Sequence, residues 1–504
     1  MPQLSKLAQA KGPQPLGHAN YAAWTPDMSD RTSGTEALGC VSREGQYAPI
    51  YSPILLNGNL AAAANQVRGA GGFYDSSGSV NVFFGDSANL YRLVGNAAVN
   101  VSGATYALGT GDTWQFAQFG NDIIAVTPTA PVSVFTLGGS SLFAPLGGSP
   151  PGDCRCVARI GDFVFVGYGN TVAWSGFNND TIWGTNPAYQ SDSQVFDNLA
   201  GRVQAIFGGY PTGVIFFENA IRVANYAGPP VIWDFGQDFV EVRRGLIAPN
   251  AAIKVGNLIY YASDQGFYKF DGLQAIPIGQ DKVDNYFLSN LNYGSRDAIF
   301  SGYDSTTKAV YWGYPAGSNT IASELLILSL VDGQWSHDFG NYELIFEMPR
   351  PGFTVDNIYP GYFSVNNLDT AGGNISIDSD LFRDSRRQLA AFDTSHRAAV
   401  FSGPPRPVTL TTTEVELAPG QRCFVSELWP IGDAVNADVS AAIGYRPAPG
   451  GPITYTTYSA MNGAGFCPQR IDSRFVRTSI QIAAGAGWKR QEGVHFRGRP
   501  SGWR

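Results

Sequence analysis

The sequence predicts an all-β fold, and three observations carry that prediction. Gly and Pro number 60 and 31 among 504 residues, about 18% of the chain against an ordinary value near 12%. They are spread between short apolar runs, as the turns that join many strands would be. Aromatic residues make up 13% of the chain and charged residues 15%, so few stretches could form a long solvated helix.

The third observation is the stretch VGNLIYYASDQGFYKFDG, residues 255–272. Residues 258–263 alternate in character, the turn Ser263-Asp264-Gln265-Gly266 follows, and residues 267–270 alternate again. Gly266 supplies the positive φ that such a turn needs. The stretch therefore predicts a β-hairpin that is rich in aromatic side chains.

The same pattern recurs along the chain as a turn, usually with Gly beside Asp or Asn, before about four large apolar residues. Counted from positions 78, 120, 161, 213, 256 and 308, the steps are 42, 41, 52, 43 and 52 residues. The apolar runs occupy residues 80–84, 123–126, 163–166, 214–217, 258–261 and 309–312. A β pattern that repeats every 40–50 residues predicts a β-propeller with one four-stranded blade per repeat.

We expect each apolar run to be the inner strand of its blade, buried on both faces between neighbouring blades. The strand after it is more amphipathic, as in residues 171–174 and 266–270. Six repeats are visible, and residues 373–377 are a weak candidate for a seventh, so we predict six to seven blades. The aromatic side chains would then pack blade against blade, and the blades should close into a ring. The alternative is an array of β-sandwiches with coincidental spacing.

Two segments lie outside the repeats, so we divide the chain into residues 1–56, 57–400 and 401–504. Residues 1–56 contain Pro13, Pro15, Pro26, Pro49 and Pro53 and little periodicity, which predicts an extended N-terminal arm before the propeller. From about residue 401 the pattern changes, and 408–417, 423–425 and 475–477 are strand candidates for a small antiparallel β domain. The last sixteen residues hold five cations against Glu492, which predicts a basic tail, either docked on another surface or solvated.

Charge and cysteine content exclude several classes of protein. The net charge of −8 lacks the basic footprint of a protein that grips nucleic acid. No run of apolar residues approaches the 18 that a membrane-spanning helix needs, and the first 15 residues do not resemble a secretory signal. Five cysteines are few and odd in number, so a disulfide framework is not expected, and synthesis in the cytosol fits best.

A search for chemistry finds no catalytic, cofactor-binding or metal-binding residue to predict, and we expect a protein that is not an enzyme. The four histidines, His18, His337, His396 and His495, are dispersed, and no nucleophile elbow, phosphate loop or EF-hand is present. Cys154 and Cys156 would share a strand face, but no neighbouring Cys or His completes a tetrahedral metal site.

Other weak signals have a structural interpretation beside the functional one. Residues 111–114 (GDTW) resemble the end of the Asp-box turn of sialidase-type propellers, and that turn is structural. The acidic stretches 234–241 and 378–384 could supply paired glycosidase carboxylates, although solvated loop carboxylates are commoner. Core packing is the favoured interpretation of five tryptophans that could otherwise stack on sugars: Trp174, Trp183, Trp233, Trp312 and Trp335.

A set of phrases follows a familiar order through residues 105–504. They are ARIGDF (158–163), WSGFNND (174–180) with Ile182-Trp183, GVIFFENAI (213–221), GFYKFDG (266–272) with IPIG (276–279), LLIL (325–328) with GQWS (333–336), and RIDSRFVR (470–477) with Trp488. Together they resemble the tail nozzle, or packaged-DNA stabilisation and tail-tube, proteins of short-tailed bacteriophages. The first hundred residues carry less of this resemblance, and the chain is short for such a nozzle.

The resemblance implies a propeller subunit that assembles as a homo-oligomeric ring, commonly a hexamer, in the phage tail of the virion after synthesis in the host cytoplasm. The ring would join the portal and adaptor above to fibre or tip proteins below. It would form the channel and gate that retain packaged DNA and release it at infection, without sequence-specific binding and without a membrane anchor. The resemblance implies no catalytic residue in this chain.

An acidic channel wall would let DNA slide without sticking, so we expect some of the excess Asp and Glu to face the lumen. The Pro-rich arm and the basic tail are candidate docking elements for neighbouring rings. The alternative function is a propeller that binds or hydrolyses glycans at a tail tip. Scattered histidines and the lack of repeated acidic pairs disfavour hydrolysis, and the uneven repeat lengths weakly disfavour a lectin.

Overall fold

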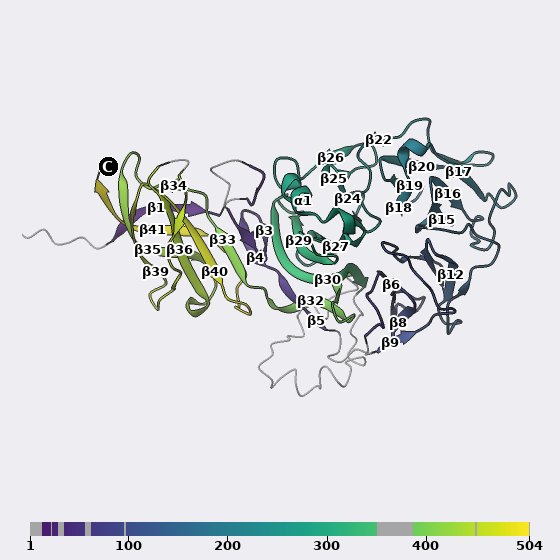
Figure 1. The fold of residues 1–504 in the computed structure, drawn as a ribbon, viewed down its shortest axis with the longest axis horizontal. Helices are drawn as coiled ribbons and strands as arrows, with labels where there is room; N and C mark the ends of the chain where they lie inside the picture. The colour runs from purple at the N-terminus through teal and green to yellow at the C-terminus, as the bar shows by residue number, and fades with distance from the viewer. Residues whose placement is uncertain are drawn as a thin grey trace, which may run out of the picture.

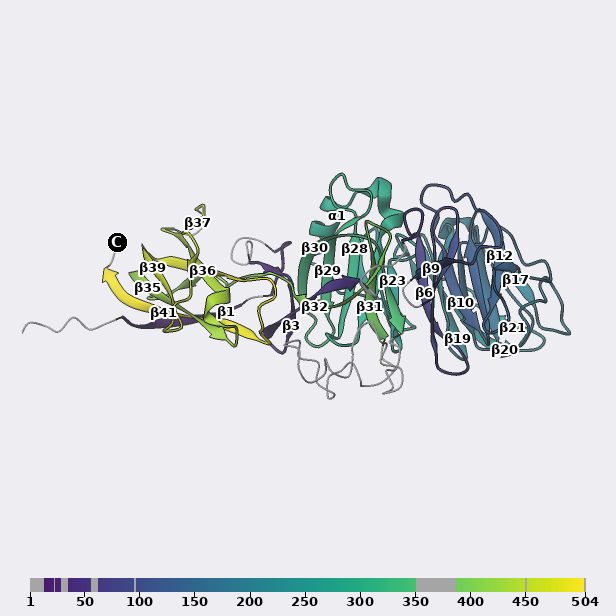
Figure 2. The ribbon, with the colours of Figure 1, turned by 90° about the horizontal axis from the view of Figure 1, so that it is seen from below.

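A computed structural model describes residues 13–21, 23–28, 35–55, 62–94, 97–349, 387–448 and 451–502. These residues form two β bodies that lie side by side, a propeller and a smaller sandwich (Figure 1). Seen from below, the blades stand edge-on and the sandwich extends the molecule in one direction (Figure 2). The all-β prediction and the propeller are confirmed.

Five blades are four-stranded antiparallel meanders, the fourth with one added strand. Blade one is β6 (Gly69–Tyr74), β7 (Val80–Gly85), β8 (Leu90–Val94) and β9 (Ala97–Asn100), and blade two is β10 (Gln115–Phe119), β11 (Asp122–Thr127), β12 (Ala130–Thr136) and β13 (Ala144–Pro145). Blade three is β14 (Cys156–Ile160), β15 (Phe163–Tyr168), β16 (Thr171–Trp174) and β17 (Asp192–Val195), and blade four is β18 (Val203–Phe207), β19 (Thr212–Phe217), β20 (Ala220–Gly228), β21 (Ile232–Asp234) and β22 (Glu241–Val242). Blade five is β23 (Ala252–Val255), β24 (Leu258–Ser263), β25 (Gly266–Phe270) and β26 (Ala275–Pro277).

Blades six and seven share one long strand. Blade six is β27 (Phe300–Asp304), β28 (Ala309–Tyr314), β29 (Ala322–Ser329) and the first half of β30 (Trp335–Pro349). The second half of β30 pairs with β31 (Arg387–Asp393), which pairs with β32 (Ala398–Pro405), which pairs with β5 (Tyr51–Leu55). These four segments form blade seven, so an N-terminal strand completes the last blade. The weak seventh repeat predicted at 373–377 lies outside the described residues.

The first strand of each blade, and not the apolar run, lies innermost. Contacts between blades join first strands to one another, as in β6 to β10 and β10 to β14, and the second half of β30 contacts both β27 and β6. The predicted inner strands are the second strands β7, β11, β15, β19, β24 and β28. A second strand is covered on both faces by neighbouring blades, which explains its continuous apolar sequence and corrects the predicted position.

Aromatic side chains fill the contacts between blades, as predicted. Phe267 of blade five has no exposed surface, and its ring centroid lies 4.9 Å from that of Trp312 and 5.0 Å from that of Trp335, both in blade six. Burying one such ring stabilises the fold by about 1.5–3 kcal/mol. Phe83 and Phe135 make the equivalent contact between blades one and two, at 5.1 Å.

Two insertions explain the uneven repeat lengths. The loop 175–191 separates β16 from β17 in blade three, and α1 (Asp284–Asn290) with η2 (Tyr293–Ala298) separates blade five from blade six. Each insertion lengthens one step to 52 residues. A further single turn, η1 (Asn198–Ala200), links blades three and four.

The C-terminal domain is a sandwich of two antiparallel sheets. The first sheet is β33 (Val408–Thr411), β34 (Val415–Glu416), β36 (Val439–Arg446), β37 (Thr454–Tyr455), β38 (Ser459–Ala460) and β40 (Phe475–Ile482), and the second contains β35 (Arg422–Gly432), β39 (Cys467–Ser473) and β41 (Gln491–Gly502), with η4 (Asn436–Asp438) between strands. Val425, Phe496, Leu410, Ile443 and Ile480 from both sheets meet in one buried cluster.

The predicted basic tail is instead a central strand of this sandwich. β41 pairs with β35 along almost its whole length and with β1 (Gln14–Asn20) on its other side. Its Val494 and Phe496 are fully buried, so alternation along the strand places them in the core and the basic residues on the surface. The sequence prediction relied on the number of basic residues and overlooked the alternating apolar residues Val494 and Phe496.

The N-terminal segment is integrated into both bodies, where an extended arm was predicted. Besides β1 and β5, it forms β2 (Ala37–Leu38) and the hairpin of β3 (Cys40–Arg43) and β4 (Gln46–Pro49). β2 runs parallel to β30 of the propeller and antiparallel to β33 of the sandwich, with Leu38 opposite His337 and Thr409. This short strand therefore joins the two bodies into one continuous sheet.

Gly39 allows the chain to turn between β2 and β3, and its replacement by Ala should be costly. Its φ is +73°, and an added Cβ would lie 2.1 Å from the carbonyl oxygen of Pro407. Gly45 is a matched control, with φ +79° and no atom within 4 Å of an added Cβ. The positive φ should cost both variants about 1–2 kcal/mol in unfolding free energy, and the clash should cost Gly39→Ala at least about 1–3 kcal/mol more. Chemical denaturation of both variants measures the difference, and equal losses would contradict the clash.

Candidate functional site

The structure places each residue that the sequence singled out, and most of them are packing residues. Trp312 and Trp335 are fully buried, and their indole N–H groups donate to the carbonyl oxygens of Ala251 and Ile278 at 3.2 and 3.1 Å. Trp174 and Trp233 are 4% exposed. Trp183, which is half-buried, donates to the Asp180 carbonyl oxygen at 2.7 Å. The described tryptophans therefore offer no row of open rings for a sugar.

The cysteines are all buried and all free. Cys154 packs in the core between blades two and three, whereas Cys156 packs in the core between blades three and four, so the two thiols point into different clusters. Burial raises the pKa of the Cys154 thiol to about 12, which leaves it protonated at neutral pH. Among the described residues, no group of three or more His, Cys, Asp and Glu side chains is placed to hold a metal ion.

The acidic stretch 234–241 uses its carboxylates to hold turns. Asp234 Oδ1 accepts from the Gly236 N–H at 2.8 Å, and Glu241 Oε1 accepts from the Ala275 N–H at 2.8 Å. The second acidic stretch, 378–384, lies outside the described residues. The Gly111–Trp114 turn is also built into packing, because the Trp114 indole donates to the Asp86 carbonyl oxygen at 2.9 Å.

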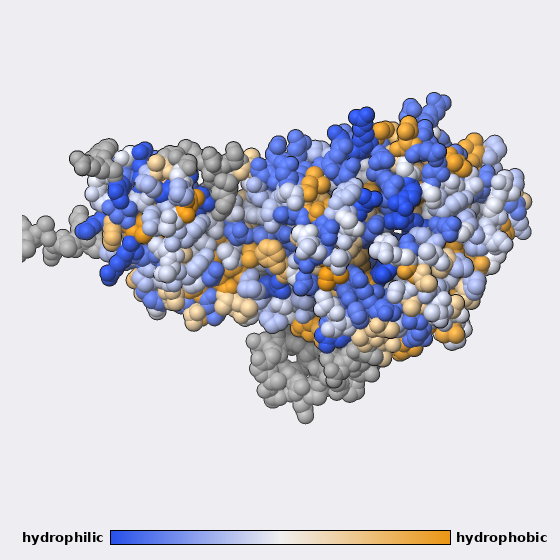
Figure 3. Space-filling view, viewed as in Figure 1, coloured by the Kyte–Doolittle hydropathy of each residue, from blue (hydrophilic) through white to orange (hydrophobic). Residues whose placement is uncertain are grey.

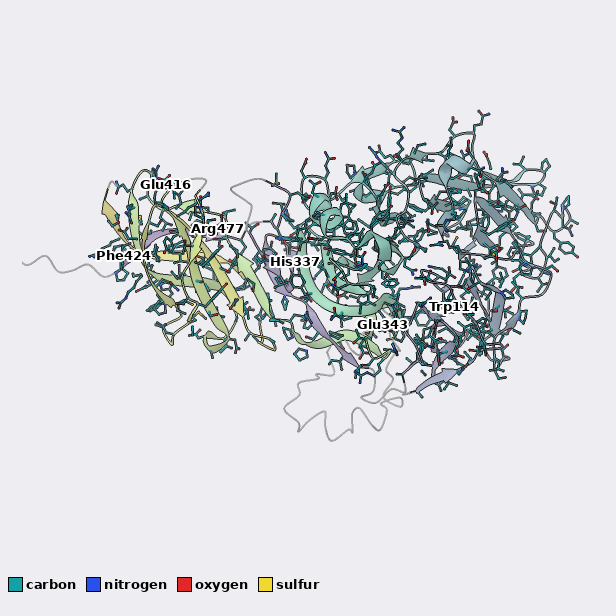
Figure 4. All side chains as sticks on the ribbon, viewed as in Figure 1. Trp114, His337, Glu343, Glu416, Phe424 and Arg477 are labelled. Carbon is teal, nitrogen blue, oxygen red and sulfur yellow. The ribbon has the colours of Figure 1, made fainter. Side chains whose placement is uncertain are left out.

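Two histidines that are distant in sequence meet on the surface of the sandwich. His18 on β1 lies opposite His495 on β41, with ring centroids 5.8 Å apart. His396 instead serves the closure of the propeller, where its Nδ1 lies 2.7 Å from Glu343 Oε1, and Glu343 Oε2 accepts from the Val67 N–H at 2.9 Å. Glu343 thus ties blade seven to the chain that enters blade one (Figure 4).

The joint between propeller and sandwich contains a cluster of buried charged groups that the sequence did not predict. His337 of β30 is labelled there in Figure 4. Its side chain is 5% exposed, its Nε2 contacts the Glu36 carboxylate, and its Nδ1 lies 3.6 Å from Glu324 Oε1. Trp24 stacks on the imidazole with ring centroids 4.3 Å apart and planes 6° apart. Three separate parts of the chain therefore meet on one side chain.

Two further contacts reinforce this joint. The Tyr286 hydroxyl donates to Glu324 Oε1 at 2.5 Å, and Arg406 Nε lies 2.8 Å from Asp338 Oδ2. Asp27 accepts from the N–H groups of Asn285 and Tyr286 at 2.7 and 2.8 Å, so the N-terminal segment also caps α1. These contacts hold the N-terminal segment against the propeller, and strand β2 of that segment also pairs with β33 of the sandwich.

We predict that His337 makes stability fall at alkaline pH. Burial alone would lower its pKa, but the carboxylates of Glu324 and Glu36 raise the pKa to about 9. Because this value exceeds the unfolded value of 6.5, the stabilisation is complete below pH 6.5 and is lost as pH rises through 9. The shift corresponds to roughly 3 kcal/mol as an upper limit.

The measurement is the unfolding free energy of wild type and His337→Gln between pH 6 and 10. The wild type should lose stability over this range relative to the variant, so that the two curves converge at alkaline pH. His495→Gln, which changes an exposed histidine, should run parallel to the wild type. Parallel curves for His337→Gln would show that the imidazole carries no charge in the joint.

No protein-family model matches the sequence, and no curated protein matches it. Among solved structures, BamB from Moraxella catarrhalis is similar at 11% identity and a TM-score of 0.36, over 72% of this chain and 93% of that one. A chain of the mitotic checkpoint complex is similar at 7% identity and a TM-score of 0.39, over 72% of this chain and 97% of that one. Among the described residues, no helix is long and apolar enough to cross a membrane.

Proposed function

We propose that the chain is a subunit of the ring-shaped tail nozzle of a short-tailed bacteriophage. The observation that carries the proposal is the ordered set of nozzle-like phrases between residues 105 and 504. Those phrases fall in both bodies: residues 213–221 span β19 and β20 of the propeller, and residues 470–477 span β39 and β40 of the sandwich. The resemblance therefore extends beyond what a generic propeller repeat would produce.

In this proposal the subunits form a ring, commonly a hexamer, between the portal and adaptor and the fibre or tip proteins. The ring retains packaged DNA and lets it pass at infection, with no catalysis, cofactor or metal. The rigid joint at His337 supports this role, because a closed ring needs every subunit to hold the same angle between its two bodies. An acidic lumen would keep DNA mobile, and a lumen lined by Lys and Arg would overturn that part of the proposal.

The test is quantitative mass spectrometry of purified phage particles, scaled to the capsid protein. About six copies per particle would support the nozzle, since a closed ring has a small fixed copy number. Electron microscopy of the tail would then locate the ring. Absence from particles, or release as free protein, would overturn the proposal and favour the glycan-binding alternative, which a glycan array tests directly.

A further inference from the structure

One exposed face of the sandwich combines cations with aromatic rings. On β41, His495, Arg497 and Arg499 point away from the core, opposite to the buried Val494 and Phe496. We define the basic face as Phe424, Trp429, Arg470, Arg497 and Arg499. Arg497 lies 4.2 Å above the Trp429 ring and Arg499 lies 5.6 Å above the Phe424 ring, so the aromatic side chains hold the guanidinium groups in a row.

The charges of this face are available to a partner. Arg422 at its edge pairs with Asp472 at 3.7 Å, and Glu427 lies opposite Arg497 in the strand register, where its carboxylate accepts from the Trp429 indole at 2.9 Å. Within the part of the chain that the structure describes, none of Arg470, Arg497 and Arg499 forms an ion pair, so the face keeps an excess of positive charge. Phe424 and Trp429 are half-buried, so apolar surface lies beside the cations. A face of this composition suits a partner that offers carboxylates together with exposed aliphatic side chains.

The propeller carries such a surface on its rim. Two turns repeat one arrangement: Asp197 Oδ1 accepts from the Leu199 N–H at 2.8 Å, and Asp271 Oδ1 accepts from the Leu273 N–H at 2.8 Å. Leu199 and Leu273 are 83% and 82% exposed, and Val242 between them is 62% exposed. We define these five residues as the acidic rim.

Hydrogen bonds connect the parts of the acidic rim. The Asn219 side-chain amide donates to the Leu199 carbonyl oxygen at 3.4 Å, and the Arg243 N–H donates to the Asn219 carbonyl oxygen at 2.6 Å. Glu241 then joins β22 to Ala275, as described above. Within the described residues, Asp197 and Asp271 form no ion pair. Arg243 is exposed beside them, and Arg244, whose side chain is 42% exposed, pairs with Glu241 at 3.7 Å. Figure 3 shows apolar surface in this region, around β20 and β22.

The net charge also differs in sign between the part of the chain that contains the propeller and the part that contains the sandwich. Residues 1–400 hold 22 Lys and Arg against 34 Asp and Glu, a net charge of −12, whereas residues 401–504 hold 11 against 7, a net charge of +4. The basic face lies at the free end of the sandwich, where Figure 4 labels Phe424, and β22 lies at the upper edge of the propeller in Figure 1, away from the sandwich. The two surfaces therefore cannot meet within one chain.

We infer that the basic face of one copy docks on the acidic rim of the next copy. The inference rests on the proposed ring, and it names the two surfaces that would build it. Each copy offers one of each surface, so the contact is head-to-tail, and such a contact closes into a ring when its rotation allows. A second copy fits better than nucleic acid, because the acidic rim supplies exposed aliphatic side chains together with carboxylates, and nucleic acid offers neither.

The experiment reverses charge on each side separately and then together. Arg497→Glu with Arg499→Glu, or Asp197→Arg with Asp271→Arg, should each weaken self-association of the full chain about tenfold or more. The combination of all four changes should restore association to within about threefold of wild type. Leu199→Ser with Leu273→Ser removes the apolar part and should also weaken association. Lys308→Glu, a reversal in the β27–β28 turn outside both surfaces, is the matched control and should change nothing.

Self-association is measured by analytical ultracentrifugation, and incorporation is measured as copies of each variant per purified particle. Both single-side reversals behaving as wild type would overturn the inference while leaving the nozzle standing. If the reversals in the basic face abolish binding of an oligonucleotide but leave self-association unchanged, the inference is also overturned, in favour of a surface that binds nucleic acid. Wild-type chain that neither associates nor occurs in particles would instead overturn the proposed function. Circular dichroism melting verifies that each variant is folded.

Discussion

Ending the chain after Lys489 is expected to unfold the C-terminal sandwich. The truncation removes β41, which lies between β35 and β1 and pairs with β35 from Arg422 to Gly432. It also removes Val494 and Phe496, which are fully buried; deleting a single core phenylalanine side chain typically costs 3–5 kcal/mol. A whole domain is stable by only about 5–15 kcal/mol, so the loss of a central strand exceeds what the sandwich can absorb.

Limited proteolysis followed by mass spectrometry measures this result. The truncated chain should be cut within residues 406–489, while most of the propeller remains as a resistant fragment. The control is the full-length chain with Arg497→Gln and Arg499→Gln, which removes two charges of the strand and keeps its backbone and its core side chains. This control should resist protease as wild type does. A truncated chain that is equally resistant would show that β41 is dispensable.

The repeat pattern predicted the blades because a strand between two blades must be apolar on both faces. That constraint is local, and it is visible in runs such as residues 163–166 and 214–217. The same runs were assigned to the wrong position within the blade, since sequence alone does not say which neighbour lies nearer the axis. The first strands, such as Gly69–Tyr74 with its three glycines, have no continuous apolar run and gave no comparable signal.

The joint and the seventh blade were not predictable, because they depend on contacts between distant parts of the chain. Leu38 pairs with His337, and Tyr51 pairs with Pro405, across about 300 residues or more in each case. Glu36 and Trp24 carry no local pattern that marks them as partners of a buried histidine. Likewise, the cations of β41 suggested a tail because their count is conspicuous, whereas the two buried residues between them are not.

Removing residues 1–56 is expected to weaken both bodies at once. The deletion takes β5 from blade seven, β1 from the sandwich and β2 from the joint, together with the Glu36 and Trp24 side chains that enclose His337. Ile50 and Val41, which are 3% and 1% exposed, leave the core that also contains Phe392 of blade seven. Without β5 the last blade ends in an open edge, and without β2 no strand holds the sandwich at a fixed angle.

Small-angle scattering and calorimetry distinguish this result from simple destabilisation. The shortened chain should have a larger radius of gyration than wild type, and its melting should separate into two transitions, because the bodies no longer unfold together. A point-mutant pair tests the core packing of the N-terminal segment alone: Ile50→Ala, just before β5, should cost about 2–5 kcal/mol in unfolding free energy, and Ile54→Ala, at a residue 41% exposed, should cost much less. A shortened chain that keeps one transition and the wild-type dimensions would show that direct contact between propeller and sandwich, without the N-terminal strands, is enough to hold them together. In that case the contact of Arg406, just before β33, with Asp338 of β30 is the next one to test, and the next variant to measure would be Arg406→Gln.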